Sequence, residues 1–234
     1  MKNLTAAGHG ETEKRAMRRL HPAIPYVAPF AVFLLFLAVK NHLPYEYPLR
    51  VLAVTAVLLI FSRKVISLHP SRPIASIMAG ATVFALWIGP DLLWPAYRQH
   101  WLFHNALTGS AQSSLPQLVR VDPVFLLFRI AGTALLVPII EELFWRAWLM
   151  RYLISPKFEK VRLGTYSLIS FWLTAILFAS EHGPYWEVGL IAGIIYNWWM
   201  IRTRSLGDCI LAHAVTNACL AVYVLAAGQW QYWL

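Results

Sequence analysis

Cysteine is nearly absent from this chain of 234 residues. The two that occur, Cys209 and Cys219, lie ten residues apart in one apolar segment. This spacing suits neither a disulfide framework nor a zinc ribbon, so it argues against the small folds that depend on either. We expect both cysteines to be packing residues.

Charge is also scarce. Charged residues make up 13% of the chain and hydrophobic residues 59%, a composition too apolar for an ordinary soluble domain. Basic residues outnumber acidic ones by nine. This excess is spread through short loops and forms no basic stripe, so it favours membrane topology and attraction to anionic lipid over nucleic-acid binding.

Long apolar runs, in contrast, are abundant. At about 1.5 Å per residue, most of them approach or reach the roughly 30 Å hydrocarbon core of a bilayer. We therefore predict an all-α, polytopic transmembrane bundle: a basic cytosolic segment at 1–22 and a single transmembrane domain at 23–234. The seven predicted helices lie at 23–39, 46–62, 74–90, 124–150, 165–181, 185–201 and 209–227.

The loop at 91–123 leaves the number of spans open. If part of it dips back into the membrane, the bundle has eight spans instead of seven. The loop is either a gate for a substrate or an ordinary extracellular loop, and an ordinary loop is the commoner case.

Basic residues in the loops predict the orientation. If the N-terminus is cytosolic and the C-terminus is outside, the cytosolic loops carry more of the basic residues, as the positive-inside rule requires. The cytosolic loops then hold Arg63, Lys64, Arg72, Arg151, Lys157, Lys160, Arg162, Arg202 and Arg204, and the outer loops hold Lys40, Arg50, Arg98 and Arg120.

Two adjacent carboxylates, Glu141 and Glu142, interrupt one of the most apolar runs. Ionisable side chains inside a membrane are costly and usually face a cavity or pair with one another. Glu142 and Arg146 are spaced i, i+4 and meet on one helical face, whereas Glu141 points about 100° away. Pro138, one turn earlier, is expected to bend the helix. Taken alone, a charged helix end emerging into the cytosol explains this pattern equally well.

Two further polar motifs accompany other apolar runs. His182 ends the fifth run, and His213 and Asn217 share one face of the last run. Taken singly, an interfacial histidine and an interhelical hydrogen bond are the more ordinary interpretations, and Glu181 beside His182 is more ordinary as a solvated loop charge. Together, a carboxylate, two histidines and an amide on three apolar segments are the groups needed to activate water and stabilise an oxyanion.

Small residues on the sixth run predict close helix packing. Gly189 and Gly193 form a small-xxx-small pair, and Asn197 continues the same face. We interpret this face as a helix contact and assign it no chemistry.

Three motifs occur in a fixed order: Glu-Glu-x-x-x-Arg at 141–146, Phe-x-x-x-His at 178–182 and His-x-x-x-Asn at 213–217. This ordered set resembles the motifs of the CPBP intramembrane proteases, described as metalloproteases or glutamic proteases, which include CAAX prenyl endopeptidases of the Ras-converting type and bacterial Abi proteins. The resemblance covers a core at 124–227. The compact chain is also similar to bacterial CAAX-protease-related proteins linked to exosortase systems.

The resemblance implies an endopeptidase that forms no covalent intermediate. Glu141 would be the general base, and His182 would help it to orient and deprotonate the attacking water. His213 and Asn217 would donate hydrogen bonds to the tetrahedral oxyanion. Each preorganised donor of this kind commonly contributes about 3 kcal/mol in a dry cavity.

By the same resemblance, Glu142 and Arg146 would brace the site. The implied partners are a membrane protein or lipidated peptide as substrate and the lipid bilayer, with no nucleic acid. We expect no cofactor, although the sequence does not exclude a metal. The expected location is the bacterial inner (plasma) membrane, with the N-terminus in the cytosol.

Alternative functions stay open at this point. A metal-dependent hydrolase would use Glu141, His182 and His213 as ligands, but there is no His-Glu-x-x-His motif and each candidate ligand is on a separate helix. A non-catalytic scaffold or immunity protein could retain the polar cavity. A transporter fits less well, because no inverted repeat is visible.

The relative depth of the motifs is a further question. Counting from the loops puts Glu141 and His213 nearer the cytosolic side and His182 near the outer end of its helix. The motifs meet only if the helices are offset or tilted, or if the turn at His182 is buried in the bundle.

Overall fold

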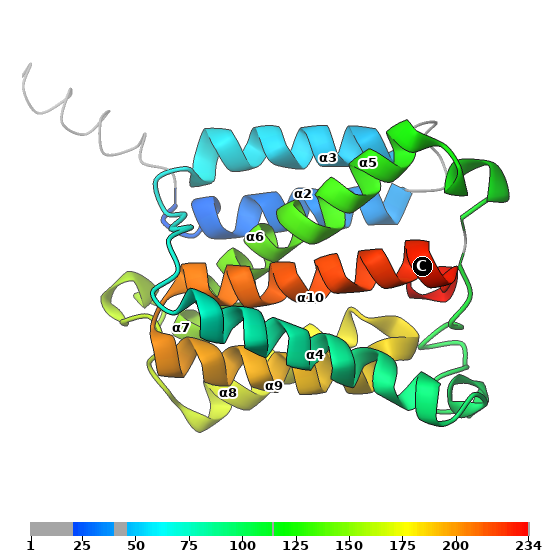
Figure 1. Cartoon of the computed structure of the whole chain (residues 1–234). Helices are drawn as coiled ribbons and strands as arrows, with labels where there is room; N and C mark the ends of the chain where they lie inside the picture. The colour runs from blue at the N-terminus through cyan, green and yellow to red at the C-terminus, as the bar shows by residue number, and fades with distance from the viewer. Residues whose placement is uncertain (1–20, 40–45, 114, 234) are drawn as a thin grey trace, which may run out of the picture.

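The computed structural model describes residues 21–39, 46–113 and 115–233, whose helices pack into a bundle (Figure 1). Nearly all of the predicted basic segment at 1–22 lies outside these residues. The all-α prediction is confirmed for the described part of the chain, where no strand forms and an isolated bridge joins Asn105 to Gly109.

Seven helical segments correspond to the seven predicted runs. Their boundaries differ from the prediction by a few residues, the usual uncertainty at helix ends. The segments are α2 (Ile24–Val39), α3 (Glu46–Val57) with the π turn η1 (Leu58–Ser62), α4 (Pro73–Leu93), one continuous helix from α5 to α7 (Pro123–Tyr152), α8 (Leu168–Ser180), α9 (Trp186–Thr203) and α10 (Leu206–Ala227).

Three of these helices are long and apolar enough to cross a membrane: α4, the α5–α7 helix and α10. Two others, α2 and α8, are apolar but shorter. The chain is therefore an integral membrane protein, and its number of crossings stays a prediction. The described part of the connection at 94–122 contains only the short 3-10 helices η2 (Tyr97–Gln99) and η3 (Gln117–Arg120), so the alternative eighth helix is not found there.

The α5–α7 helix begins at a well-formed cap and is interrupted twice. The Asp122 side chain accepts hydrogen bonds from the first turn of α5 (Pro123–Ala131), as expected of an N-cap aspartate. Two π turns, η4 (Gly132–Leu136) and η5 (Leu143–Leu149), flank α6 (Val137–Glu142). Such turns often occur at functional sites, and here they enclose the two adjacent carboxylates.

Helix α10 runs through the middle of the bundle (Figure 1) and packs against α4, α6 and α9. Glycine allows the closest of these approaches: a Cβ added at Gly80 of α4 would lie 2.2 Å from the Ala212 carbonyl oxygen of α10. The predicted contact face of α9 behaves similarly, because a Cβ at Gly193 would lie 3.2 Å from Ala175 Cα on α8. Small residues thus set these helix separations.

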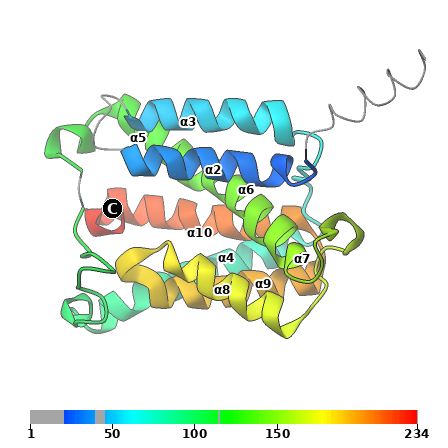
Figure 2. The ribbon, with the colours of Figure 1, turned by 180° about the vertical axis from the view of Figure 1, so that it is seen from behind.

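The end of α8 determines where His182 lies relative to the other motifs. This helix has only 13 residues, and the 3-10 helix η7 (Gly183–Tyr185) then leads directly into α9 (Figure 2). Two hydrogen bonds hold the 94–122 connection against the turn between α8 and α9. Arg98 Nη1 donates to Pro184 O at 2.6 Å, and Trp186 Nε1 donates to Leu102 O at 3.0 Å. His182 therefore lies inside the bundle, as the predicted meeting of the motifs requires.

Candidate active site

A cavity of about 170 Å³ lies at the centre of the bundle. The four residues assigned catalytic roles by the resemblance all line it: Glu141 from α6, His182 from the turn after α8, and His213 and Asn217 from α10. Aromatic side chains form much of the remaining wall, from Trp87, Phe178, Tyr196, Tyr232 and Trp233. Three segments far apart in the sequence thus supply polar groups to one small, largely apolar space.

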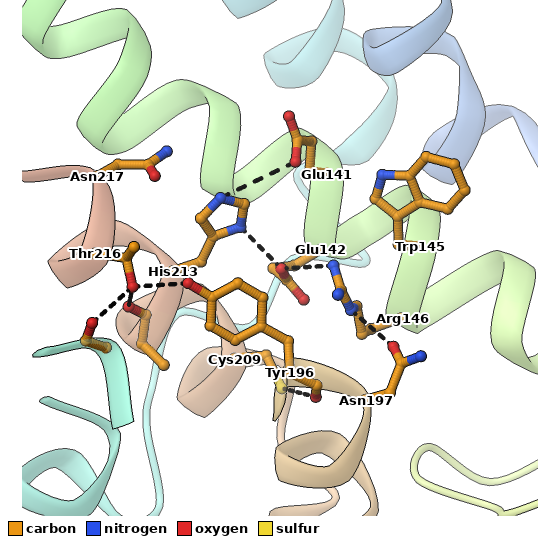
Figure 3. Close-up of polar contacts among 12 residues, drawn as sticks. Glu141, Glu142, Trp145, Arg146, Tyr196, Asn197, Cys209, His213, Thr216 and Asn217 are labelled. Atoms are coloured by element: carbon orange, nitrogen blue, oxygen red, sulfur yellow. Dashed lines mark hydrogen bonds and ion pairs between the residues drawn. The ribbon is translucent and has the colours of Figure 1, made fainter. Parts of the chain in front are cut away.

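Behind this cavity, Glu142 and Arg146 form a fully buried pair (Figure 3). Arg146 Nη1 lies 3.0 Å from Glu142 Oε1, so the predicted i, i+4 contact is confirmed. Arg146 Nε also donates to Asn197 Oδ1 at 3.1 Å, and the guanidinium lies 4.4 Å from the centroid of the Phe178 ring. Neither member of the pair lines the cavity, so their contact with it is indirect.

His213 connects the buried pair to the cavity. Its Nδ1 lies 2.9 Å from Glu142 Oε1, and its ring stacks on Tyr196 with the centroids 5.0 Å apart. Because the same Glu142 oxygen accepts a hydrogen bond from Arg146, we assign the proton on this side to Nδ1 of His213, so that the oxygen is the acceptor of both contacts. The other nitrogen, Nε2, then faces Glu141, whose Oε2 is 4.0 Å away.

The Glu141 carboxylate has an oxygen without a hydrogen-bond partner among the described residues. That oxygen is Oε2, and the side chain is buried. Buried polar atoms normally find a partner, so an unpartnered carboxylate oxygen facing a cavity indicates an atom available to a ligand or water. The expectation that Glu141 is left without the arginine agrees with this geometry.

His182 is oriented by its own helix. Its Nδ1 lies 2.7 Å from the Phe178 carbonyl oxygen, which can only accept a hydrogen bond, so Nδ1 carries a proton and Nε2 is the acceptor of the neutral ring. The rings of Trp87 and Phe178 flank the imidazole at centroid distances of 5.2 and 4.7 Å. A Cβ at Gly189 would lie 3.1 Å from this ring, so the glycine interpreted as a packing residue also makes room for His182.

Asn217 is held by the π turn on the opposite wall. Its Nδ2 donates to the Thr133 carbonyl oxygen at 2.9 Å, and no other hydrogen bond of this amide is found within the described ranges. The second N–H and the Oδ1 atom are therefore available to the cavity.

A second, larger cavity of about 1070 Å³ adjoins the first. The two share lining residues at Trp87, Arg129, Thr133, Val137, His182 and Tyr232. Residues 108–110 of the 94–122 connection and side chains of α2, α3 and α5 form its outer wall. This outer cavity is large enough for an extended peptide segment or a lipid chain beside the inner one.

Sequence reasoning missed some residues near the site. Asn197 was interpreted as a packing residue, yet it binds Arg146 and donates from Nδ2 to Phe171 O at 2.8 Å. Glu181 was interpreted as a solvated charge; it is exposed toward the outer cavity, and it also accepts a hydrogen bond from Trp145 Nε1 at 3.0 Å. A polar amide inside an apolar helix could have indicated that Asn197 bonds to a buried polar partner. Trp87 lines both cavities, but nothing in its neighbouring sequence distinguished it from other tryptophans.

The metal-ligand alternative named Glu141, His182 and His213. These residues line one cavity, but within 21–39, 46–113 and 115–233 no group of three or more His, Cys, Asp or Glu side chains is arranged to hold a metal ion. Both cysteines are free in the structure.

Comparisons with known proteins bear on the same region. No curated protein and no solved structure matches the chain. Residues 123–219 match the family model described as type II CAAX prenyl endopeptidase Rce1-like. The match runs from the start of α5 into α10 and contains all three sequence motifs, so the resemblance predicted from those motifs is confirmed. Over residues 123–219, the chain is therefore similar to the type II CAAX prenyl endopeptidases described as Rce1-like, a family of proteases.

Proposed function

We propose that this protein is an intramembrane endopeptidase that hydrolyses a peptide bond near a membrane-embedded or lipid-modified segment of its substrate. One observation carries the proposal: Glu141, His182, His213 and Asn217 line the same cavity of about 170 Å³ inside an apolar bundle. A general base, a water-orienting group and oxyanion donors must converge on one reacting carbonyl, and the convergence of these four residues on one cavity supports giving them those roles.

The first step is water activation. Nε2 of neutral His182 accepts a hydrogen bond from a water molecule, and the unpartnered Oε2 of Glu141 removes a proton from it. The water oxygen then attacks the carbonyl carbon of the scissile peptide bond. The π electrons of that carbonyl move to its oxygen, which becomes a tetrahedral oxyanion.

Oxyanion stabilisation falls to His213 and Asn217. Asn217 donates its second N–H. His213 donates from Nε2, and because its Nδ1–H is already directed at Glu142, this requires an imidazolium ring. The buried Glu142 carboxylate therefore keeps His213 in the orientation in which Nε2 faces the cavity, and such preorganised donors are often the largest contribution to this kind of catalysis.

Collapse of the intermediate completes the reaction. The carbon–nitrogen bond breaks as the carbonyl reforms, and the leaving amine takes the proton that Glu141 removed from water. One water is consumed, and one carboxylic acid and one amine are produced. These steps use no cofactor.

The substrate we infer is a membrane protein or lipidated peptide. The outer cavity supports this, because its wall combines apolar side chains such as Phe33, Leu37 and Phe125 with the polar turn at His182. For this chain, a prenylated substrate is an inference from the family description alone. The location we infer is a bacterial inner membrane, with the N-terminus in the cytosol.

A comparison of membrane-protein termini tests the proposal. Cells carrying the native chain, Glu141→Gln or Glu159→Gln at matched abundance are analysed by mass spectrometry. Glu141→Gln keeps the shape of the side chain and removes the base, whereas Glu159 is exposed outside both cavities. We expect new termini with the native chain and with Glu159→Gln, and none with Glu141→Gln. Identical termini in all three strains would favour the scaffold or immunity alternative.

Metal removal distinguishes the proposed mechanism from the metal-dependent alternative. A peptide spanning a terminus identified above is incubated with purified protein before and after treatment with EDTA and 1,10-phenanthroline. Because water is activated here by Glu141 and His182, we expect cleavage to survive chelation. Cleavage that is lost on chelation and restored by zinc would contradict the mechanism while leaving the protease assignment intact.

A further inference from the structure

The π turn η4 leaves one backbone carbonyl of the α5–α7 helix without a helical donor. In this turn the Val137 N–H donates to Gly132 O, the i to i+5 pattern of a π helix. Val137 is also the residue that would donate to Thr133 O in an α-helix. The α-helical donor of the Thr133 carbonyl is therefore already engaged elsewhere.

The π-helical donor of the same carbonyl is absent for a covalent reason. In the i to i+5 pattern, Thr133 O would accept from residue 138, and residue 138 is proline. Proline has no backbone N–H. Neither register of the helix can therefore supply a donor to Thr133 O, although a backbone carbonyl inside a membrane bundle needs one.

Asn217 supplies the missing donor from another helix. Its Nδ2 lies 2.9 Å from Thr133 O, and both residues line the inner cavity. Because a carbonyl oxygen only accepts, this contact fixes which end of the amide faces η4 and prevents the amide from flipping. The carboxamide is thereby held as a hydrogen-bond donor on the wall of the cavity.

We propose that Pro138 is a positioning residue for Asn217. By supplying no N–H, it keeps the Thr133 carbonyl available, and the carbonyl in turn orients the amide that donates to the oxyanion. The catalytic consequence rests on the proposed function, but the positioning itself does not. Replacing Pro138 with alanine restores a backbone N–H that competes with Asn217 for Thr133 O.

Side-chain amide signals test this positioning without any substrate. The chain contains five asparagines, so protein labelled with ¹⁵N-asparagine in detergent micelles gives few amide pairs, and the Asn217 pair is assigned by its loss in Asn217→Ala. Asn197, whose Nδ2 donates to Phe171 O at 2.8 Å, is an internal reference. Pro29→Ala is the matched control, because Pro29 also lies inside an apolar helix but lines neither cavity.

In Pro138→Ala we expect exchange of the Asn217 amide hydrogens with solvent to become about fivefold faster, the factor for losing one hydrogen bond of typical net strength. The Asn197 pair should not change, and Pro29→Ala should leave both pairs as they are in the native protein. An unchanged Asn217 pair in Pro138→Ala would overturn the proposal. Equal changes at Asn197 and Asn217 would also overturn it, since they would indicate general loosening of the helix.

Cleavage of the peptide mapped by the termini comparison separates this inference from the proposed function. If Pro138 acts through Asn217, the double variant Pro138→Ala/Asn217→Ala should cleave as slowly as Asn217→Ala alone, with the loss in kcat and not in KM. If the double variant loses more kcat than Asn217→Ala alone, so that the two single losses add, the positioning role is contradicted even if the protein is a protease. If Asn217→Ala cleaves normally, the proposed oxyanion role fails while the amide signals still report on Pro138.

Discussion

At the scale of single residues, Glu142 links Arg146 to His213. One of its oxygens accepts from both Arg146, at 3.0 Å, and His213, at 2.9 Å. The arginine pairs with this carboxylate, and the contact of the carboxylate with Nδ1 of His213 leaves Nε2 facing the cavity. A residue that touches no part of the cavity thereby determines the orientation of one that does.

This arrangement predicts an asymmetric response to substitution. Arg146→Met leaves the Glu142 carboxylate buried without its cation, and breaking such a pair typically costs about 3–5 kcal/mol of folding free energy. The double variant Arg146→Met/Glu142→Leu removes both charges and should recover much of that loss. Thermal unfolding of the purified variants in one detergent measures the difference. A double variant that is less stable than Arg146→Met alone would contradict this prediction.

At the scale of elements, glycine allows α4 and α10 to approach closely. A Cβ at Gly80 would lie 2.2 Å from Ala212 O, whereas a Cβ at Gly89 on the same helix would meet nothing within 4 Å. Gly80→Ala should therefore destabilise the bundle by about 1–3 kcal/mol through overpacking. Gly89→Ala should be neutral or stabilising, because alanine favours helix. Equal melting temperatures for the two variants would argue against close packing of α4 on α10.

The same elements show what the sequence could and could not predict. The helices were predictable because each is an apolar run, and the Glu142–Arg146 contact because i, i+4 spacing survives at the end of α6. The π turns around Pro138 were not predictable, since they depend on backbone register. The ordered motifs placed His182 and Glu141 in one site, but the apolar runs did not predict how both come to line the same cavity. Their arrangement depends on the shortness of α8 and on the connection that packs over its end.

At the scale of the whole molecule, the long connections between helices lie at the two ends of the bundle (Figures 1 and 2). The connection at 94–122 lies at one end and the α7–α8 connection lies at the other (Figures 1 and 2). Basic residues are concentrated in the α7–α8 connection, at Lys157, Lys160 and Arg162. The positive-inside rule therefore predicts that this end faces the cytosol.

Cysteine labelling in a background of Cys209→Ala and Cys219→Ala tests that orientation. The two probe positions are Leu107, which is 94% exposed in the 94–122 connection, and Lys157, which is exposed between α7 and α8. In intact spheroplasts, a membrane-impermeant maleimide should label Leu107→Cys and leave Lys157→Cys unlabelled until the membrane is permeabilised. Labelling of Lys157→Cys alone in intact spheroplasts would show that the topology is the reverse of the predicted one. Labelling of both would mean that the two ends of the bundle face the same side, which a bundle crossing the membrane along its helices does not allow.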